Sequence, residues 1–565
     1  MKGSIVATFL GAVLVAAGVL LPSSSVVHGL RPHPGELLEP LLAGAGLFRA
    51  GLVALGIALA GASFLPWWRL PVRSPDPAPV SRFQWIVFAL LMAAAVGLRL
   101  HDLGVGLWYD EIVTYVKFAP LSWGEIVTDY SSQNQHFLYT LLAHASFETF
   151  GESAAALRLP AALFGIGSIA ALFLLGRRVT TTRETLLACG LLTFSYHHVW
   201  FSQNARGYSG MLFWTVLSSW LLVRALRETR PALWPAYAAA AAMGVYTHMT
   251  MVFVVAGHFL IWVLAMVTRR NEPWPARWSG LVLGFVPSGL FVFLLYALVL
   301  PQLFGGTLHQ GTNSTVSDWK NPLWTLVELA RGMDSTALGG VMQVAVLFGV
   351  LAVGLAGYRR DRATVPQLLL VPAMVGGALT MAMGHPLWPR FFFFTAGFGA
   401  LVVVRATSSL GSAGARLARR PAAGVAAGTA LCLVGLLYSA GSLRYAYLPK
   451  QDYEAALAWV EERRGPGDAV ITVGTAALPF DWLHQVDWTE TNDPAEIRRI
   501  AADADRTWLV YTLPLHLESV YPEVMAAIRT DFAVEQTFYG TLGDGVIYVC
   551  RAAPPSSSAS GPPSR

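Results

Sequence analysis

Thirteen apolar runs constrain this chain more than any other feature of its sequence. They extend from residues 5–21 to residues 421–440, and a membrane-spanning helix needs about 20 apolar residues. Of the 565 residues, 55% are hydrophobic and 13% are charged, whereas roughly 25% are charged in an ordinary soluble domain. We therefore predict a mainly α-helical, polytopic membrane protein with about 13 spans. The composition argues against a soluble enzyme, a disordered protein and a partner made of nucleic acid.

The distribution of arginine predicts one orientation in the membrane. With Lys2 inside and the spans alternating, the inner loops hold 19 arginines and the outer loops hold far fewer basic residues. Cytoplasmic loops of membrane proteins carry such an excess, so the C-terminus is expected outside, and the net charge of +5 needs no nucleic acid to explain it. The inner arginines are Arg69, Arg73, Arg82, Arg177, Arg178, Arg183, Arg224, Arg227, Arg230, Arg269, Arg270, Arg277, Arg359, Arg360, Arg362, Arg405, Arg416, Arg419 and Arg420.

Segment lengths and composition predict four parts of the chain. Residues 1–82 hold two additional spans and a cytoplasmic linker, and residues 1–21 are read as a retained anchor because no convincing signal-peptidase site follows them. The core, 83–440, carries a first outer loop at 101–157 and a second at 301–336, both long enough to be functional. Residues 441–551 become more charged and predict a small extracytoplasmic α/β domain, and the tail 552–565 is rich in Pro and Ser and is expected to be disordered.

The C-terminal domain is expected to combine helices and strands. Asp452–Arg464 and Pro494–Ala502 have the pattern of helices, and Asp493 stands where a capping residue is preferred. Short β-branched and aromatic runs predict the strands; these are 469–473, 507–513, 532–538 and 545–549.

Two adjacent carboxylates begin the first outer loop. Asp110 and Glu111 follow Leu107-Trp108-Tyr109, directly beyond a span. One interpretation is a solvated acidic pair at the interface. The other is a general base, since partial desolvation at the membrane surface raises the basicity of a carboxylate. Neighbouring side chains point in different directions, so the two residues are not expected to share one role.

Cations and histidines recur at the same predicted outer face. His136 precedes a helix of about 14 residues that is too short to span and is expected along the interface. Arg206 stands alone at a span end, His248 lies in a turn between two spans, and Arg390 precedes four phenylalanines. A snorkelling arginine, an interfacial histidine and a polar turn are the structural alternatives; a phosphate clamp is the functional one.

These groups together suit a reaction in which an acceptor hydroxyl attacks a carbon that is activated by a phosphate. The base accepts the proton, and fixed donors stabilise the charge that develops on the phosphate. The sequence holds no Walker-type loop and no glycine-rich dinucleotide motif after a strand. A lipid-linked donor then fits better than a nucleotide-linked one, because its phosphate lies at the level of the headgroups.

On these motifs the chain resembles the GT-C membrane glycosyltransferases, and within them the protein mannosyltransferase and aminoarabinose transferase group of bacteria (glycosyltransferase family 39-like). The motifs that carry the resemblance are Asp110-Glu111, His136 to Gly151, Leu157-Arg158-Leu159-Pro160, Gly176-Arg177-Arg178, Ser202 to Tyr208, Tyr246-Thr247-His248 and Pro389-Arg390-Phe391. The family often has His-Pro-Pro-Leu-Tyr where this chain has Gln135 to Tyr139, and an acidic residue where Asn204 stands.

The resemblance implies an inverting transfer of a sugar from a polyprenyl-phosphate donor to a lipid, glycan or protein hydroxyl, at the outer face of a bacterial inner (plasma) membrane. It implies Asp110 as the base with Glu111 beside it. No ligand cluster is visible, no cofactor is certain, and a divalent cation on Glu111 stays open. A transporter or flippase of lipid-linked glycans is the alternative function, and a non-catalytic envelope-assembly protein is a third. The residues expected to bind the donor phosphate or substrate are His136, Arg158, Arg206, Tyr208, Tyr246, His248 and Arg390.

Overall fold

The computed structural model describes residues 2–65, 78–228, 230–268, 274–306, 340–358, 363–543 and 545–552. They form two compact units: a helical unit, drawn from 2–103, 118–306 and 340–446, and a C-terminal unit, drawn from 104–117 and 447–552. Several sequence predictions fall outside the described residues. These are Arg69, Arg73, Arg269, Arg270, Arg359, Arg360 and Arg362, most of the second outer loop, and the tail after residue 552.

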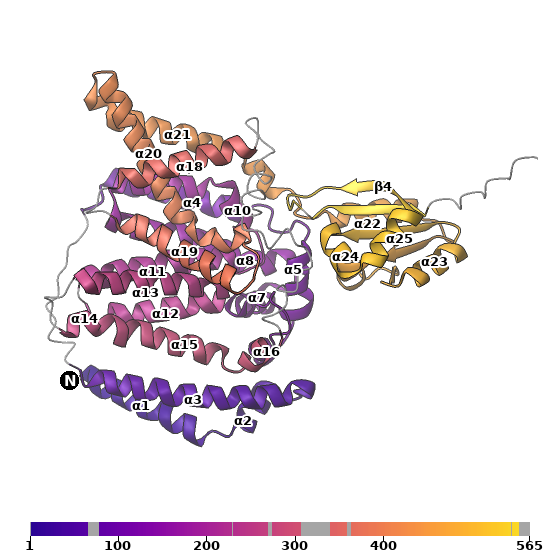
Figure 1. Cartoon of the computed structure of the whole chain (residues 1–565), viewed down its shortest axis with the longest axis horizontal. Helices are drawn as coiled ribbons and strands as arrows, with labels where there is room; N and C mark the ends of the chain where they lie inside the picture. The colour runs from indigo at the N-terminus through magenta and orange to yellow at the C-terminus, as the bar shows by residue number, and fades with distance from the viewer. Residues whose placement is uncertain are drawn as a thin grey trace, which may run out of the picture. The chain divides into compact units, whose positions relative to one another are not determined.

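The helical unit is a bundle of long helices that run side by side (Figure 1). Central in it, α11 packs against α8 and α12, and α12 packs against α15. Its α-helices are α1 (Lys2–Leu20), α2 (Ser23–Leu30), α3 (Leu38–Ser63), α4 (Arg82–Leu100), α6 (Trp123–Thr128), α7 (Phe137–Phe150), α8 (Ala154–Val179), α9 (Thr182–Thr193), α10 (Tyr196–Ser202), α11 (Tyr208–Glu228), α12 (Leu233–Thr247), α13 (Val252–Thr268), α14 (Trp274–Gly280), α15 (Val286–Tyr296), α16 (Leu300–Phe304), α18 (Gly340–Gly357), α19 (Thr364–Ala382), α20 (Ala396–Leu417) and α21 (Gly424–Gly441).

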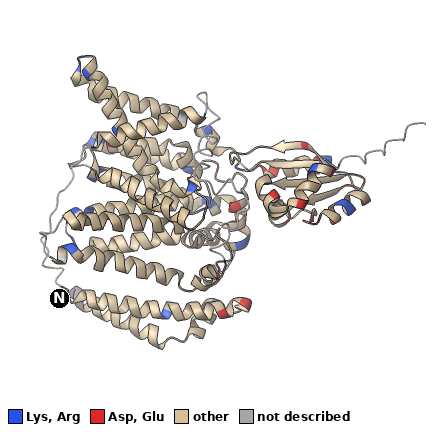
Figure 2. Ribbon diagram, in the orientation of Figure 1, with Lys and Arg blue, Asp and Glu red and all other residues tan. Residues whose placement is uncertain are grey.

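Within the described ranges, nine helices are long and apolar enough to cross a membrane, and a pair bent by 94°, Ile5–Leu20 with Ser23–Leu30, makes a tenth candidate. Figure 2 shows that the middle of most of these helices carries neither acidic nor basic side chains. The predicted class of a polytopic integral membrane protein with a small C-terminal α/β domain is confirmed. Within the described ranges, some of the thirteen predicted apolar runs form shorter or broken helices.

The predicted run 184–201 shows why. It is divided between α9 and α10, since α9 ends at Thr193 and Ser195 caps α10 by accepting a hydrogen bond of 3.3 Å from the His198 N–H. The buried Arg99 guanidinium donates to the carbonyls of Leu192 and Thr193 at 3.2 and 3.3 Å. These are carbonyls that a continuing helix would use itself, so the side chain stabilises the break.

Acidic residues of the predicted inner loops are paired with the predicted inner arginines. Glu228 contacts Arg178 at 3.1 Å and Arg224 at 2.8 Å, and Glu184 contacts Arg405 at 2.8 Å. The Arg178 contact joins α8 with α11, the Arg224 contact lies within α11, and the Arg405 contact joins α9 with α20. These pairs fasten several helices at one end of the bundle, where a buried acidic group requires a cation.

The C-terminal unit contains a five-stranded sheet of order β2-β1-β3-β5-β4. The strands β1 (Ala469–Thr472), β2 (Thr489–Glu490) and β3 (Thr507–Thr512) run parallel; β5 (Ile547–Ala552) is antiparallel to β3 and to β4 (Phe532–Phe538). Its core packs Ile471 and Leu509 of the sheet with Ile497 and Ile528 of the helices. The helices are α5 (Tyr109–Val113), α22 (Tyr453–Arg463), α23 (Pro494–Asp503), α24 (Pro514–Val520) and α25 (Pro522–Asp531).

The element predictions for this unit hold for most segments. Helices 452–464 and 494–502 correspond to α22 and α23, and Asp493 caps α23 by accepting from the Ala495 N–H at 2.9 Å. Four predicted strands are present, the last of them displaced to Ile547–Ala552. The sequence analysis missed β2, which has two residues, and the helices α24 and α25, each of which begins with a proline.

Candidate functional site

The side-chain rings of two buried histidines, which come from distant segments of the chain, lie next to each other in the helical unit. His136 immediately precedes α7, and His248 follows the last residue of α12. Their ring centroids are 4.6 Å apart, and the Tyr208 ring at the start of α11 lies 4.7 Å from His248. His136 is 7% and His248 5% exposed. The fold therefore brings together three residues that the sequence nominated separately.

The hydrogen bonds of the two rings differ, and they assign two different tautomers to the neutral rings. Nδ1 of His248 accepts from the Thr250 backbone N–H at 3.4 Å and lies 2.8 Å from Thr250 Oγ1, so its proton is on Nε2. His136 instead donates to the backbone carbonyl of Thr247, and its Nε2 is the nitrogen without a partner. A neutral His136 thus presents Nε2 as an acceptor, whereas His248 presents an Nε2–H donor.

Both Nε2 atoms are buried and have no hydrogen-bond partner among the described residues. A buried polar atom without a partner costs about 1–3 kcal/mol, so an arrangement that keeps two of them side by side calls for a function. A ligand that accepts one hydrogen bond and donates another satisfies both atoms.

Two arginines give this site a positive potential. Burial, followed by the charges of Arg206 and Arg390, lowers the pKa of His248 to about 3. Burial and the Arg206 charge also hold the pKa of His136 well below its ordinary value, with smaller effects from His248 and Arg390. The rings therefore stay neutral while the guanidinium groups keep their charge, which suits an anionic ligand.

Arg206 and Arg390 are held by two different kinds of contact. Arg206 is 4% exposed and donates from Nη1 to the Asn134 carbonyl at 3.4 Å. Arg390, in the 3₁₀ helix Pro389–Thr395, lies over the Trp388 ring with its guanidinium carbon 4.8 Å from the ring centroid. Both contacts attract a guanidinium group, the aromatic face through a cation–π interaction.

Gly207 allows the close approach that builds the site. A Cβ at this position would lie 2.2 Å from the Thr247 carbonyl oxygen and 3.1 Å from His136 Nδ1. Both are shorter than normal contacts, so only glycine fits at this position, where the residue before α11 meets the end of α12 and the residue before α7. The sequence analysis quoted Gly207 within the Ser202–Tyr208 motif but gave it no role.

Stacked aromatic rings support the histidine pair. Tyr246 stacks on Phe137 at a centroid distance of 5.2 Å, and Phe137 stacks on Tyr130 at 5.6 Å. Burial raises the pKa of Tyr130 to about 12, although the charge of Arg206 acts in the opposite direction. The Tyr130 phenol therefore lies near that arginine. The sequence gave no reason to select Tyr130, because an aromatic residue in an outer loop is common near a membrane interface.

Arg158, another residue that the sequence predicts to bind the substrate, contacts the backbone at Leu103. Its side chain is 2% exposed and donates from Nη1 to the Leu103 carbonyl at 3.0 Å. Tyr139 Oη donates to the carbonyl of the preceding Leu157 at 2.6 Å. Arg158 thus fixes the last residue of the helical unit before the segment 104–117.

Asp110 and Glu111 belong to the C-terminal unit, in α5. Glu111 is fully buried, and its Oε2 accepts from the Trp108 backbone N–H at 3.3 Å, where it caps the start of α5. Asp110 is partly exposed, and its charge reaches the phenols of Tyr109 and Tyr453, whose pKa values are raised by burial first and by Asp110 in addition. The adjacent carboxylates therefore differ in surroundings, as neighbouring positions on a helix should.

No three His, Cys, Asp or Glu side chains of the described ranges are grouped so that they could hold a metal ion. Glu111 already accepts a backbone hydrogen bond, which uses one of its oxygens. A divalent cation on Glu111 stays a prediction.

A family model described as dolichyl-phosphate-mannose-protein mannosyltransferase matches residues 135–296. That segment holds His136, Arg158, Arg206, Tyr208, Tyr246 and His248, six of the nine nominated residues; Asp110, Glu111 and Arg390 lie outside it. No curated protein matches the chain.

Among solved structures, ArnT from Cupriavidus metallidurans bound to undecaprenyl phosphate is similar, at 15% identity and a TM-score of 0.48, over 86% of this chain and 100% of that one. The Archaeoglobus fulgidus oligosaccharyltransferase in complex with Zn and sulfate has 15% identity and a TM-score of 0.47, over 80% of this chain and 72% of that one. The Saccharomyces cerevisiae protein O-mannosyltransferase complex Pmt1–Pmt2 bound to its sugar donor has 14% identity and a TM-score of 0.30, over 42% and 36%. The match of the family model over residues 135–296 confirms the predicted resemblance to membrane glycosyltransferases that use lipid-linked sugar donors.

Proposed function

We propose that the chain transfers a sugar from a polyprenyl-phosphate donor to an acceptor hydroxyl, with inversion, at the extracytoplasmic face of the membrane. The observation that carries the proposal is the buried pair of unpartnered imidazole nitrogens beside two guanidinium groups. The description of the matching family model names dolichyl-phosphate mannose, a donor of this chemical class.

In the proposed site, the phosphate of the donor is bound by Arg206, Arg390 and the Nε2–H of His248. Charge-assisted hydrogen bonds from guanidinium groups are about twice as strong as neutral ones, and they act on a phosphate that gains negative charge as the sugar leaves. Nε2 of His136 lacks a proton and suits a sugar hydroxyl that donates to it. The difference in tautomers therefore assigns one histidine to the phosphate and the other to the sugar.

Asp110 is the proposed base. It takes the proton of the acceptor hydroxyl while the acceptor oxygen bonds to the anomeric carbon and the bond from that carbon to the phosphate oxygen breaks. Attack from the face opposite the leaving group inverts the anomeric configuration. Glu111, buried at the start of α5, is a positioning residue in this scheme.

The proposal is tested with the full chain in lipid nanodiscs. Undecaprenyl phosphate should bind the unaltered chain and the Asp110→Asn variant equally, and Arg206→Ala and Arg390→Ala should each bind it at least about tenfold more weakly, as expected for a lost charge-assisted bond. Lipid extracts of cells that carry Asp110→Asn should accumulate the intact donor. An active Asp110→Asn protein would reject the base, and undiminished lipid binding by both arginine variants would reject the phosphate site.

The observations favour the enzyme over a transporter of lipid-linked glycans. Transporters bind substrate near the bilayer midplane, between repeated halves. The residues of this cluster stand at helix ends instead: His136 before α7, Arg206 two residues before α11, Tyr208 at the start of α11, and His248 after α12. A transporter would move a lipid-linked glycan without consuming it, so the accumulation experiment separates the two functions.

A further inference from the structure

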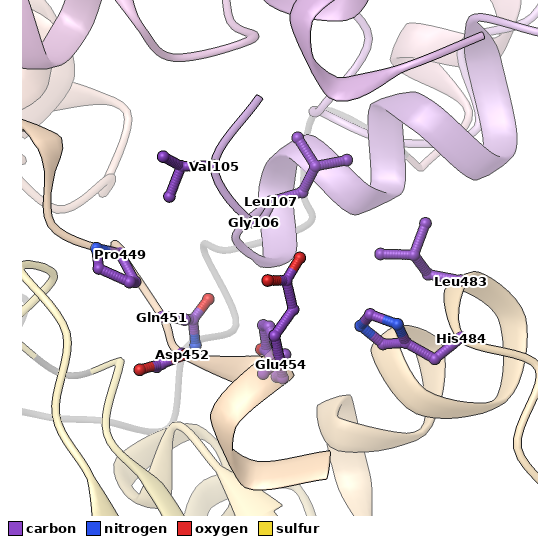
Figure 3. A pocket seen from close by; sticks show the side chains of 10 residues that line it. Val105, Gly106, Leu107, Pro449, Gln451, Asp452, Glu454, Leu483 and His484 are labelled. Carbon is purple, nitrogen blue, oxygen red and sulfur yellow. The ribbon is translucent and has the colours of Figure 1, made fainter. Parts of the chain in front are cut away.

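The C-terminal unit has a small hollow beside the segment that leads to α5. It is lined by residues 105–107, 449, 451–454 and 483–484, and the Glu454 side chain extends toward Gly106 and Leu107 (Figure 3). Its volume of about 50 Å³ gives room for a few water molecules but not for a sugar ring. The buried polar contacts that bear on the transfer lie in the helical unit instead.

The short helix α10 leads directly into the loop that carries Arg206. The helix has seven residues and ends at Ser202, four residues before Arg206. A helix of this length is not stable by itself, so contacts with the rest of the bundle must hold α10 in place. Its position decides where the chain enters the loop.

The side chain of Arg99 in α4 holds the first turn of α10. It is fully buried, and besides two carbonyls at the end of α9 it contacts the ring of His198, which is fully buried too. A guanidinium group has donors only, so Nη2 of Arg99 donates to Nδ1 of His198. The proton of the neutral ring is then on Nε2, and the contact requires this neutral form.

The backbone of Arg99 binds the other end of α10. Gln203, the residue after the helix, donates from Nε2 to the Arg99 carbonyl at 3.4 Å and also to the His101 carbonyl. Gln203 is 4% exposed, so these bonds are shielded from water. Arg99 thus contacts α10 through its side chain in the first turn and through its carbonyl at the end.

Rings of α10 also lie against the 3₁₀ helix that carries Arg390. The centroid of the Phe201 ring is 4.3 Å from that of Phe393, and the His198 ring is 6.1 Å from it. Phe393 and Arg390 belong to the same 3₁₀ helix, Pro389–Thr395. The helix α10 therefore supports both cations of the proposed donor site, one through the chain and the other through ring packing.

We propose that Arg99 and His198 are positioning residues that place the two guanidinium groups of the donor site. The inference rests on the proposed function, which gives Arg206 and Arg390 their role. Burial of a charged group is costly, and an apolar side chain would fill the same space without that cost. What the buried charge of Arg99 adds is a set of hydrogen bonds that fixes α10 and, through it, both cations.

The test measures undecaprenyl phosphate affinity and thermal unfolding for the full chain in nanodiscs. His198→Leu removes the acceptor for Arg99 and should weaken lipid binding by about tenfold, as for the loss of one hydrogen bond to a charged group. His198→Asn keeps an oxygen near the position of Nδ1 and should recover most of the affinity. The matched control is His258→Leu. His258 is equally buried and lies 3.0 Å from Ser219 Oγ, about three turns along α11 from Tyr208, so this variant should unfold at a lower temperature and bind the lipid normally.

Amide hydrogen exchange of residues 203–207 measures the placement of the loop without a lipid. It should be faster in His198→Leu than in the unaltered chain, and unchanged in His258→Leu. Gly165→Ala is a second variant, which leaves the buried pair itself intact. Its Cβ would lie 2.1 Å from Ser202 Oγ and displace the end of α10, so exchange should rise and lipid affinity should fall here too.

Normal lipid affinity in His198→Leu and Gly165→Ala, or an equal loss of affinity in His258→Leu, would overturn the inference. If His198→Leu does not fold, Gly165→Ala decides. If the unaltered chain fails to bind the lipid while exchange of the loop still rises in His198→Leu, the proposed function is wrong and the placement of the loop by α10 stands. If the unaltered chain binds the lipid and both variants bind it equally well, only this inference is wrong.

Discussion

The backbone N–H of Tyr109 donates a hydrogen bond of 2.9 Å to Oε1 of Gln451, although 342 positions separate the two residues. Tyr109 is the first residue of α5, where a backbone N–H has no partner within the helix. The amide of Gln451 is itself held by Thr512 Oγ1 at 3.1 Å. The C-terminal unit therefore fixes the start of the helix on which Asp110 lies.

Loss of this bond should slow transfer. We expect Gln451→Leu to reduce kcat by about five- to tenfold, which corresponds to about 1–1.5 kcal/mol for one hydrogen bond, because α5 becomes less ordered. The KM for the donor should stay unchanged. Gln451→Glu retains an acceptor for the Tyr109 N–H and should recover part of the rate; steady-state kinetics in nanodiscs measure both, and equal losses in the two variants would contradict the role of the bond.

Glu111 and Asp110 should respond differently to loss of charge. Glu111→Gln keeps an oxygen that can accept from the Trp108 N–H, so transfer should fall only a few-fold. Glu111→Ala removes the cap, which costs about 1 kcal/mol, and should lower both the rate and the unfolding temperature. Asp110→Asn should abolish transfer without lowering that temperature. If Glu111→Gln were as inactive as Asp110→Asn, Glu111 would have a direct chemical role.

Gly207→Ala should disrupt the donor site by steric overlap. The added Cβ would lie 2.2 Å from the Thr247 carbonyl oxygen, and the end of α12 would have to move away together with His248. Undecaprenyl phosphate binding, followed by native mass spectrometry, should be lost or reduced at least about tenfold. Gly97→Ala is the control, since a Cβ at Gly97 in α4 meets no atom within 4 Å. Normal lipid binding by Gly207→Ala would show that this close approach is not needed.

The pH dependence of donor binding should change when a guanidinium group is removed. Burial and the charges of Arg206 and Arg390 lower the pKa of His248 to about 3, so both histidines stay neutral and binding should vary little between pH 6 and 8. Arg206→Gln removes a positive charge, which raises the pKa of His136 and His248 toward the ordinary value of about 6.5. Burial, the larger cause of the low pKa, remains in this variant, so affinity, although weaker overall, should increase only as the pH falls below 6, where a protonated ring attracts the phosphate. Titration of undecaprenyl phosphate at several pH values checks this, and a flat profile in Arg206→Gln would contradict it.

Arginine and lysine should not be equivalent at position 206. Arg206→Lys keeps the charge but loses the planar fork that can bind two phosphate oxygens at once, and its shorter reach weakens the bond to the Asn134 carbonyl. We expect lipid affinity between those of the unaltered chain and Arg206→Ala. Full recovery with lysine would show that only the charge matters.

Hydrophobic runs, the arginine bias and caps such as Asp493 act locally, so the amino-acid sequence is enough to predict the membrane class, most helix positions and the strands of the C-terminal unit. The meeting of His136, Tyr208 and His248 in one cluster, and the place of α5 with residues 447–552, depend on tertiary packing. That packing also decides the different tautomers, since it selects the partners Thr247 and Thr250. A run of apolar residues predicts that a helix forms but not which neighbouring helix it packs against. Contacts between residues about 100 or more positions apart therefore depend on how whole helices pack together.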